Sequence, residues 1–188
     1  MRSRILKSRA GMTLIEVLVA VVLTGILTTA TFKFYQASHG QALVQQDISD
    51  LQLICRNTIY ELKKSLRMAG YKINSHDACE MAGDTLCIYM QGAQPVDTIR
   101  YFLGQMSGMY SGDGQEERDI YELRRQVNSQ TYETFAECIS TINYNMIDSA
   151  NVEITVTAEA ERRDPDYDQN DGYRSYSLTE RVKIRNVR

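Results

Sequence analysis

The spacing of apolar side chains changes along the chain, and the first region is an almost uninterrupted apolar run. Residues 12–32, MTLIEVLVAVVLTGILTTATF, contain one ionisable side chain, Glu16. As a helix this run is about 31 Å long, which matches a hydrocarbon core of about 30 Å. It therefore predicts a single membrane-spanning helix. The alternatives are a buried core helix and a secretory signal cleaved near Thr28-Thr29-Ala30, although signal sequences have shorter apolar runs of about 7–15 residues.

Beyond this run, apolar residues recur every three or four positions as far as residue 69. Such spacing places them on one face of a helix; they are Val44, Ile48, Leu51, Cys55, Ile59, Leu62, Leu66 and Ala69. No proline interrupts the segment, so we predict one nearly continuous helix from about Met12 to Ala69. It ends at Gly70, in the position where a left-handed C-terminal cap is common. An independent coiled coil is the alternative for the second half of this helix.

After Gly70 the pattern alternates between apolar and polar positions, which is typical of half-buried strands. The predicted strands are residues 86–90, 98–103, 120–127, 139–146, 152–158 and 176–187. An antiparallel sheet packed on the amphipathic part of the helix would bury both apolar faces. We therefore predict an α+β fold, with a helix followed by a sheet domain over residues 71–188.

Charge is unevenly distributed between the N-terminus and the rest of the chain. The whole chain has 21 basic and 24 acidic residues, but the first eleven residues hold Arg2, Arg4, Lys7 and Arg9 and no acid. The remainder thus has 17 basic and 24 acidic residues, a net charge of −7. Basic residues resist translocation, so we expect a cytoplasmic N-terminus and an exported chain after Lys33. The whole-chain net charge of −3 gives no reason to expect a nucleic-acid partner.

Glu16 needs an explanation because an unpaired carboxylate in an apolar span costs several kcal/mol. One interpretation is that Glu16 extends to the membrane interface. The string Gly11-Met12-Thr13-Leu14-Ile15-Glu16, between a basic leader and an apolar helix, instead closely resembles the type IV prepilin processing site. The resemblance implies cleavage between Gly11 and Met12 by a prepilin peptidase and N-methylation of Met12. Most members of that family have phenylalanine at the position of Met12.

The resemblance also implies a domain order and an assembly role. A leader, residues 1–11, is removed; residues 12–33 form the transmembrane half of the helix, 34–70 the amphipathic half, and 71–188 the sheet domain of a type IV pilin fold. In a filament, the N-terminal amine of one subunit can pair with the Glu16 carboxylate of a neighbour. The implied partners are other minor and major pilins and the inner-membrane assembly platform.

Two further strings refine the resemblance within this family. Leu66-Arg67-Met68-Ala69-Gly70-Tyr71 is similar to a string of PilW-like minor pilins, and the basic end Arg181–Arg188 also suits them. The implied function is a non-catalytic minor pilin for pilus initiation or the pilus tip, found first in the inner membrane and then in the pilus. The alternatives are a J-type minor pseudopilin of type II secretion and, in another class, a membrane-anchored periplasmic adhesin or binding domain.

The four cysteines all follow the apolar run, in the part of the chain that we expect to be exported and oxidised. Of three possible connectivities, we favour Cys79 with Cys87, closing a polar loop, and Cys55 with Cys138, joining the helix to a strand. A buried thiol is the alternative for Cys55. A zinc site is disfavoured because the sequence has no CxxC pair and only two histidines, His39 and His76.

An acidic segment between the last two predicted strands offers oxygen ligands for calcium. The candidate ligands are Asp164, Asp166, Asp168, Asn170 and Asp171. The spacing does not match an EF-hand, and a solvated acidic loop is the alternative. The sequence lacks a recognisable Ser/His/Asp, Cys/His or HExxH arrangement, so we predict that the protein is not an enzyme.

Overall fold

The computed structural model describes residues 12–73, 78–91, 96–105, 121–164 and 166–186. The chain divides into two compact units, one ending at Val44 and the other comprising Gln45–Arg188. The boundary falls inside a helix, at the residue where the predicted apolar stripe begins. Below, the first unit means the residues up to Val44, and the second unit means the rest.

Helix α1 extends over Leu14–Met68, which confirms the predicted helix to within two residues at its start and one at its end. Gly70 follows with φ +72°, a left-handed conformation that glycine adopts without strain. Its N–H donates to the carbonyl oxygen of Tyr89 at 2.8 Å. A Cβ atom on Gly70 would lie 2.6 Å from the carbonyl oxygen of Asn186. The predicted glycine cap is therefore confirmed, and close packing also requires glycine there.

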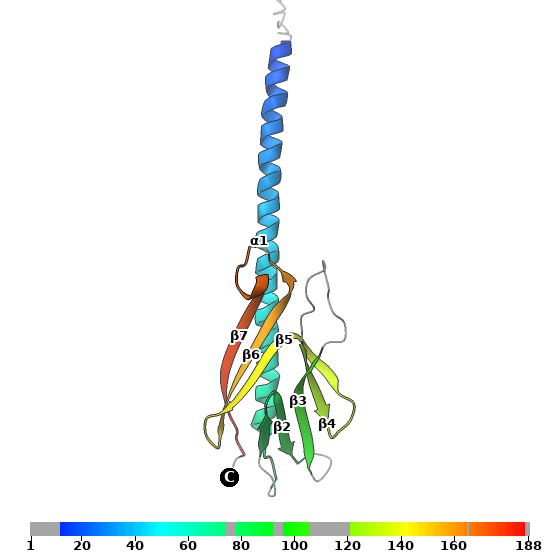
Figure 1. Cartoon of the computed structure of the whole chain (residues 1–188), viewed down its shortest axis with the longest axis vertical. Coiled ribbons are helices and arrows are strands. Elements are labelled where there is room, and N and C mark those ends of the chain that lie inside the picture. The colour runs from blue at the N-terminus through cyan, green and yellow to red at the C-terminus, as the bar shows by residue number, and fades with distance from the viewer. Residues whose placement is uncertain (1–11, 74–77, 92–95, 106–120, 165, 187–188) are drawn as a thin grey trace, which may run out of the picture. The chain divides into compact units, whose positions relative to one another are not determined.

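Among the described residues, seven antiparallel strands form one sheet in which each strand pairs with the next one in sequence (Figure 1). The strands are β1 (Cys79–Ala82), β2 (Thr85–Met90), β3 (Asp97–Gln105), β4 (Tyr121–Val127), β5 (Glu133–Met146), β6 (Asn151–Arg163) and β7 (Tyr173–Lys183), with a short 3-10 turn η1 (Asn170–Gly172) before β7. The predicted α+β class is confirmed, and so are the six predicted strands, with β5 and β6 longer than expected. Ile120 lies outside the described residues, and β7 ends four residues earlier than predicted.

The sequence pattern does not predict strand β1, because its residues belong to the polar stretch between Cys79 and Cys87. It forms a tight hairpin with β2, in which Ala82 pairs with Thr85 across Gly83 and Asp84. Gly83 has φ +58°, as the first position of a two-residue hairpin turn requires. The Gly-Asp pair between short apolar runs is the sequence signal that could have identified this hairpin.

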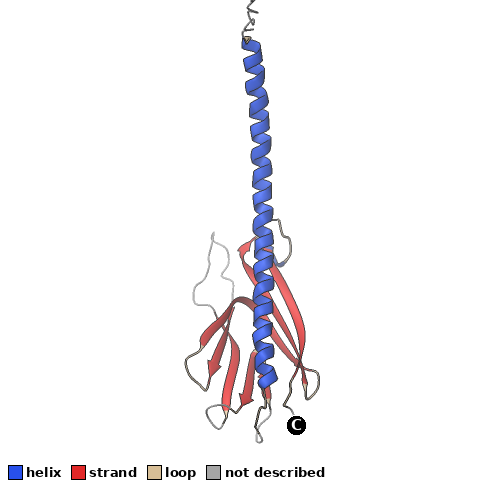
Figure 2. Cartoon of the chain, turned by 180° about the vertical axis from the view of Figure 1, so that it is seen from behind, coloured by secondary structure: helices blue, strands red, loops and turns tan. Residues whose placement is uncertain are grey.

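Within the second unit, the end of helix α1 packs against one face of the curled sheet (Figure 2). The buried helix residues are Leu51, Cys55, Thr58, Ile59, Leu62, Ser65 and Leu66. On β6, Val152, Ile154, Val156 and Ala158 are fully buried, which confirms the predicted alternation. Burial of these apolar side chains is the main stabilising contribution in this unit.

Two polar residues on the buried helix face were not part of the predicted stripe. The Ser65 hydroxyl and the Tyr101 hydroxyl are hydrogen bonded at 2.8 Å, and Tyr101 is fully buried. The Thr58 hydroxyl is also buried but has no hydrogen-bond partner. At the edge of this contact, Lys63 forms an ion pair with Glu180 of β7. Two polar contacts, Ser65 with Tyr101 and Lys63 with Glu180, therefore help to hold the helix on the sheet.

Strand β5 changes its partner part-way along its length. Its first half pairs with β4 through Glu133, Thr134, Ala136 and Ile139, whereas Ile139–Met146 pairs with β6. The change occurs beside Cys138, which has φ +60° in a region of irregular register between β4 and β5. A bulge of this kind bends a strand and redirects its edge.

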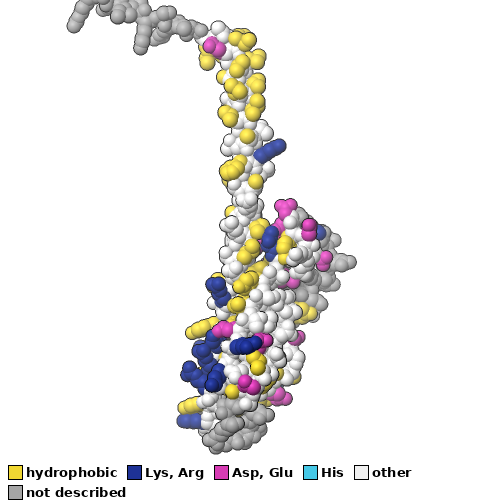
Figure 3. Space-filling view, turned by 90° about the vertical axis from the view of Figure 1, so that its left-hand side faces the viewer, with side chains coloured by type: hydrophobic (Ala, Val, Ile, Leu, Met, Phe, Trp, Pro, Cys, Tyr) yellow, Lys and Arg dark blue, Asp and Glu magenta, His cyan; other side chains and the backbone are white. Residues whose placement is uncertain are grey.

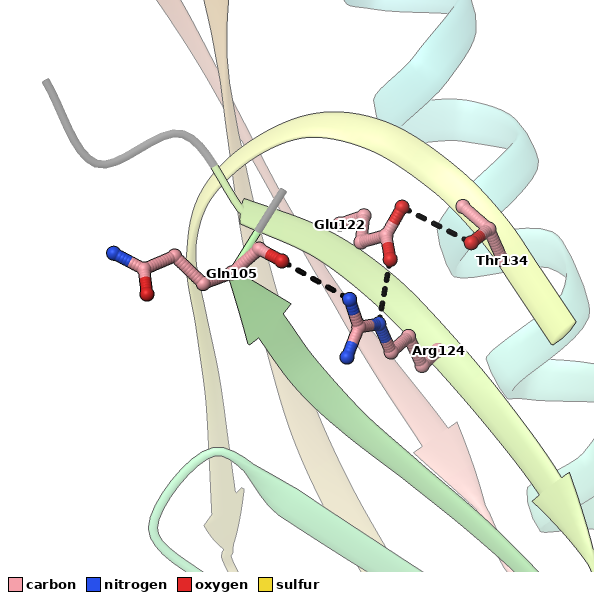
Figure 4. A network of polar contacts seen from close by, with 4 residues as sticks. All are labelled: Gln105, Glu122, Arg124 and Thr134. Atoms are coloured by element: carbon pink, nitrogen blue, oxygen red, sulfur yellow. Dashed lines mark hydrogen bonds and ion pairs between the residues drawn. The ribbon is translucent and has the colours of Figure 1, made fainter. Parts of the chain in front are cut away.

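A polar network fixes the first half of β5 against β4 (Figure 4). Arg124 Nε donates to Glu122 at 2.5 Å, and an Arg124 terminal nitrogen donates to the Gln105 carbonyl oxygen at 3.0 Å. The other oxygen of Glu122 accepts a hydrogen bond from the Thr134 hydroxyl at 3.0 Å. Glu122 and Arg124 are mostly buried, so this network holds three neighbouring strands in register.

Candidate functional site

The predicted processing and assembly residues lie at the start of helix α1. Gly11 lies outside the described residues. Met12 is the first described residue, and its side chain is 72% exposed. Thr13 immediately precedes the helix, and Glu16 lies in the first helical turn. Helix formation therefore begins two residues after the predicted cleavage position.

Thr13 and Glu16 form a reciprocal cap at this helix start. The Thr13 backbone N–H and hydroxyl donate to one Glu16 carboxylate oxygen at 2.9 and 3.1 Å. In return, the Glu16 backbone N–H donates to the Thr13 hydroxyl oxygen at 3.3 Å. This arrangement is a capping box, and its Thr-x-x-Glu signature can be recognised in the sequence. Glu16 thus has a local structural role besides the predicted role in assembly.

In the apolar part of the first unit, side chains are exposed on every side of the helix. Leu14, Val22, Ile26 and Leu27 are between 53% and 84% exposed. The hydroxyls of Thr24, Thr28, Thr29 and Thr31 each donate to the carbonyl oxygen four residues earlier. An apolar surface whose polar groups bond within the helix suits a lipid environment. In the described part of the chain, α1 is the one helix long and apolar enough to cross a membrane.

The predicted Cys79–Cys87 disulfide is wrong, because the two residues lie on opposite faces of the β1–β2 hairpin. Cys79 pairs with Ile88, and Cys87 pairs with Glu80. Cys79 and Ile88 are buried, whereas Cys87 is only half-buried and Glu80 is exposed. A shift of one residue in register would be needed to bring both sulfur atoms to one face.

The predicted Cys55–Cys138 disulfide is also absent, since both residues are thiols. The Cys55 thiol points at the carbonyl oxygens of Tyr176 and Val156, at 3.4 and 3.7 Å, and burial raises its pKa. The Cys138 thiol donates to Glu161 at 3.1 Å. Burial, this hydrogen bond and nearby carboxylates raise the pKa of Cys138 to about 12. Both thiols are therefore protonated at neutral pH, which agrees with the alternative of a buried Cys55 thiol.

The acidic loop before β7 carries the candidate calcium ligands, and one of them, Asp164, already has other partners. The Asp164 carboxylate accepts hydrogen bonds from the Asp166 backbone N–H at 3.0 Å and from Arg174 at 2.8 Å; these contacts lower its pKa. Among the described residues, no three His, Cys, Asp or Glu side chains are grouped as metal ligands. The candidate residues Asp166, Asp168, Asn170 and Asp171 are exposed. The calcium site and the solvated loop both stay predictions.

A basic surface in the second unit was not identified from the sequence. Figure 3 shows Lys and Arg side chains gathered on one face of this unit. On helix α1, Arg56, Tyr60, Lys64 and Arg67 are exposed at spacings of three and four residues, so they lie on the face opposite the buried stripe. The spacing was visible in the sequence. A polar helix face, however, is most simply a solvated one, and no further signal gave it a function.

His39 and His76 were not assigned a function. His39 stacks with Tyr35 on the first unit, with 6.1 Å between ring centroids, and His76 lies outside the described residues.

Comparison with known proteins identifies one match, at the N-terminus. The family model of the prokaryotic N-terminal methylation motif matches residues 6–32. No curated protein and no solved structure matches the chain. The matched range includes the Gly11–Met12 bond, the Thr13–Glu16 cap and the apolar run. The motif implies processing by a prepilin peptidase and assembly with other pilins. The match therefore supports a membrane-anchored, type IV pilin-like or pseudopilin subunit.

Proposed function

We propose that the protein is a minor pilin of the PilW-like group, a non-catalytic subunit that helps to initiate a type IV pilus or lies at its tip. The observation that carries this proposal is the methylation motif at residues 6–32. Two further features support it. The N-terminal part of the helix exposes apolar side chains and is long enough to cross a membrane, and the same chain contains a sheet domain with its own core. The basic leader stays in the cytoplasm, and the chain beyond Lys33 is exported.

Processing and assembly then follow from the chemistry of the N-terminus. Cleavage after Gly11 gives Met12 a new, positively charged amine, which is methylated. The subunit leaves the inner membrane for a filament core, where this amine lies beside the Glu16 carboxylate of a neighbouring pilin. Pairing offsets the cost of removing both charges from water. The sheet domain contacts other minor pilins.

Mass spectrometry of the mature N-terminus tests the processing step directly. We expect a chain that starts with N-methylated Met12. Gly11→Arg should block cleavage and leave the leader attached, whereas Gly40→Ala, at a helical position with open space around it, should be processed normally. An intact Met1 in the unaltered protein, or a cut near Ala30, contradicts the proposal.

Two substitutions at Glu16 separate its charge from its capping role. Gln can keep the side-chain contact with the Thr13 backbone N–H but carries no charge, whereas Ala removes both. If charge pairing guides assembly, Glu16→Gln and Glu16→Ala should both be cleaved normally and both lower incorporation into filaments, as measured by immunoblots of sheared pili. Incorporation of Glu16→Gln at the unaltered level would contradict charge pairing and leave the cap as the relevant contact.

Deletion of the gene distinguishes the pilus from type II secretion. Loss of surface pili with normal exoprotein secretion is the expected result. Loss of secretion with normal piliation would instead assign the protein to a minor pseudopilin.

A further inference from the structure

The sheet of the second unit opens beyond the point where β5 changes partners. The register of β5 with β6 extends from Met146 and Val152 to Ile139 and Ala158, and from Ile139 towards its N-terminus β5 follows β4. Two strand segments, Thr134–Cys138 and Ala160–Arg163, therefore diverge from the bulge. In Figure 1 the start of β5 turns away from β6 and follows β4. Near the start of the opening, the Cys138 thiol and the Glu161 carboxylate still touch, at 3.1 Å.

A groove of about 1050 Å³ occupies this opening. Its sides are the two diverging strand segments, and helix α1 contributes residues between Asp47 and Thr58. Leu51 and Ala160 line it with buried apolar side chains, and Phe135 does so with a half-buried ring. The lining also includes Thr58, whose buried hydroxyl has no hydrogen-bond partner. The groove thus combines apolar contact surface, strand edges and an unsatisfied polar group.

The charged side chains around the groove are mainly acidic. Five acids, Asp47, Asp50, Glu137, Glu159 and Glu161, line it against two bases, Arg162 and Arg163. Arg163 Nε donates to the Asp171 carbonyl oxygen at 3.0 Å, which fixes this side chain and leaves its positive charge in place. The excess of negative charge favours a cationic occupant and disfavours nucleic acid or an acidic peptide.

We propose that this groove binds a basic, extended segment of a partner protein, which adds a strand along the open edge of β6. Strand addition satisfies exposed backbone groups, and alternate side chains provide specificity. One set of side chains would contact the apolar lining, and the other set, Lys or Arg, would face the acidic rim. At about 3.3 Å per residue, a segment of five residues spans about 17 Å.

The chain's own basic C-terminal stretch is a poor occupant for a neighbouring copy. Arg181 and Lys183 belong to β7 and are paired with β6, and Val182 and Ile184 are buried in the core. Releasing this stretch would expose part of that core. A different protein with an available basic segment therefore fits the groove better than a second copy does.

Peptide binding to the full chain in a non-ionic detergent tests the proposal. The probe is a fluorescent heptapeptide of alternating valine and lysine with blocked ends, and the control peptide has glutamate in place of lysine. We expect the lysine peptide to bind at least 10-fold more tightly than the control. Neutralising two exposed rim carboxylates, in the double variant Asp50→Asn and Glu137→Gln, should weaken binding several-fold. The matched variant Asp84→Asn, an exposed acid on the β1–β2 turn, should not.

Hydrogen exchange locates the bound peptide. Strand addition should slow amide exchange in Ala160–Arg163, the β6 segment beyond the bulge. Equal binding of the two peptides, no binding of the lysine peptide below 1 mM, or bound peptide without slower exchange in this segment would each overturn the proposal. These measurements do not depend on the N-terminal motif, so the minor pilin assignment can fail without affecting them.

Discussion

Helix α1 is a single helix with two different surfaces. Before Val44 its apolar side chains are exposed, whereas after Val44 a stripe of them is buried against the sheet. In the first unit, Leu23 is 55% exposed, and its neighbours are similarly open. In the second unit, Leu62 is fully buried against the sheet. Apolar surface of the first kind has to be covered by another molecule, whether lipid or subunit. One helix can therefore be stabilised by its own domain in one part and by its surroundings in another.

The hydroxyl groups of the helix show the same difference. Thr24 and Thr28, in the first unit, donate to carbonyl oxygens of their own helix. Ser65, in the second unit, bonds instead with Tyr101 of the sheet. A polar group in lipid has to be satisfied within its own segment, whereas one in a protein core can be satisfied by a distant residue.

Truncating one leucine in each part of the helix gives the largest expected contrast. Leu62→Ala leaves a cavity in the core and should lower the free energy of unfolding by about 2–5 kcal/mol. Leu23→Ala should change it by less than about 0.5 kcal/mol, because its side chain is 55% exposed and fills no core. Urea unfolding of the detergent-solubilised chain, followed by near-UV tyrosine circular dichroism, measures both. Similar losses in the two variants would contradict the division of the helix.

Glycine substitutions give the next contrast. Gly70→Ala forces a left-handed alanine and a Cβ contact of 2.6 Å with the Asn186 carbonyl oxygen. We expect a loss of about 1–3 kcal/mol in the free energy of unfolding. Gly40→Ala lies in a helix with open space around it and should increase helix stability by up to about 1 kcal/mol. Thermal melts at 222 nm compare the two, and a neutral Gly70→Ala would show that neither strain nor packing matters at the cap.

The buried hydroxyl pair should give a smaller effect. Tyr101→Phe leaves the Ser65 hydroxyl without its partner and should cost about 1 kcal/mol of unfolding free energy. Combining Tyr101→Phe with Ser65→Ala removes both polar groups and should cost less than the two single losses added together. Thr24→Val in the first unit should leave urea unfolding of the sheet domain unchanged. Strict additivity of the two core substitutions would mean that the hydroxyls do not interact energetically.

Acid should weaken the sheet domain as the Asp164 carboxylate becomes protonated. Contacts with Asp166 and Arg174 lower the pKa of Asp164 below its ordinary value of 3.8. Because the folded-state pKa is the lower one, the stabilisation is present above about pH 4 and is lost as the pH falls through the folded pKa.

Asp164→Asn should therefore flatten the decline of the urea midpoint below pH 4. Asp168→Asn removes a charge from the same loop but keeps the ion pair with Arg174, so it serves as the control. The same pH profile in both variants would contradict a specific role for Asp164.

The helix and most strands could be predicted because their apolar residues repeat with a clear period. Val152, Ile154, Val156 and Ala158 alternate without exception, and all four are buried. β1 was missed because four residues with a glutamate carry little periodic signal. The first half of β5 was missed because a bulge at Cys138 interrupts its alternation.

The polar features could be predicted only where they depend on short spacing. The Thr13–Glu16 cap is readable from three residues of separation, whereas the partner of Ser65 lies 36 residues away. The pairing of cysteines depends on register, which composition does not specify. Cys79 and Cys87 fall on opposite faces because of the position of the turn between them. The groove could not be predicted either, because it depends on the register change at Cys138, where β5 changes its partner strand.

The strand order has a consequence for the sequence of folding events. Because each strand pairs with the next one along the chain, the hairpins can close one after another between neighbours in sequence, which favours rapid steps. By contrast, the helix also contacts the last strand. The Cys55 thiol lies against the carbonyl oxygen of Tyr176 in β7, which is 121 residues further along the chain. Part of the helix stripe therefore stays uncovered until β7 has been synthesised. Docking of the helix, rather than growth of the sheet, should limit the folding rate, and a nascent chain is most prone to aggregate just before β7 is complete.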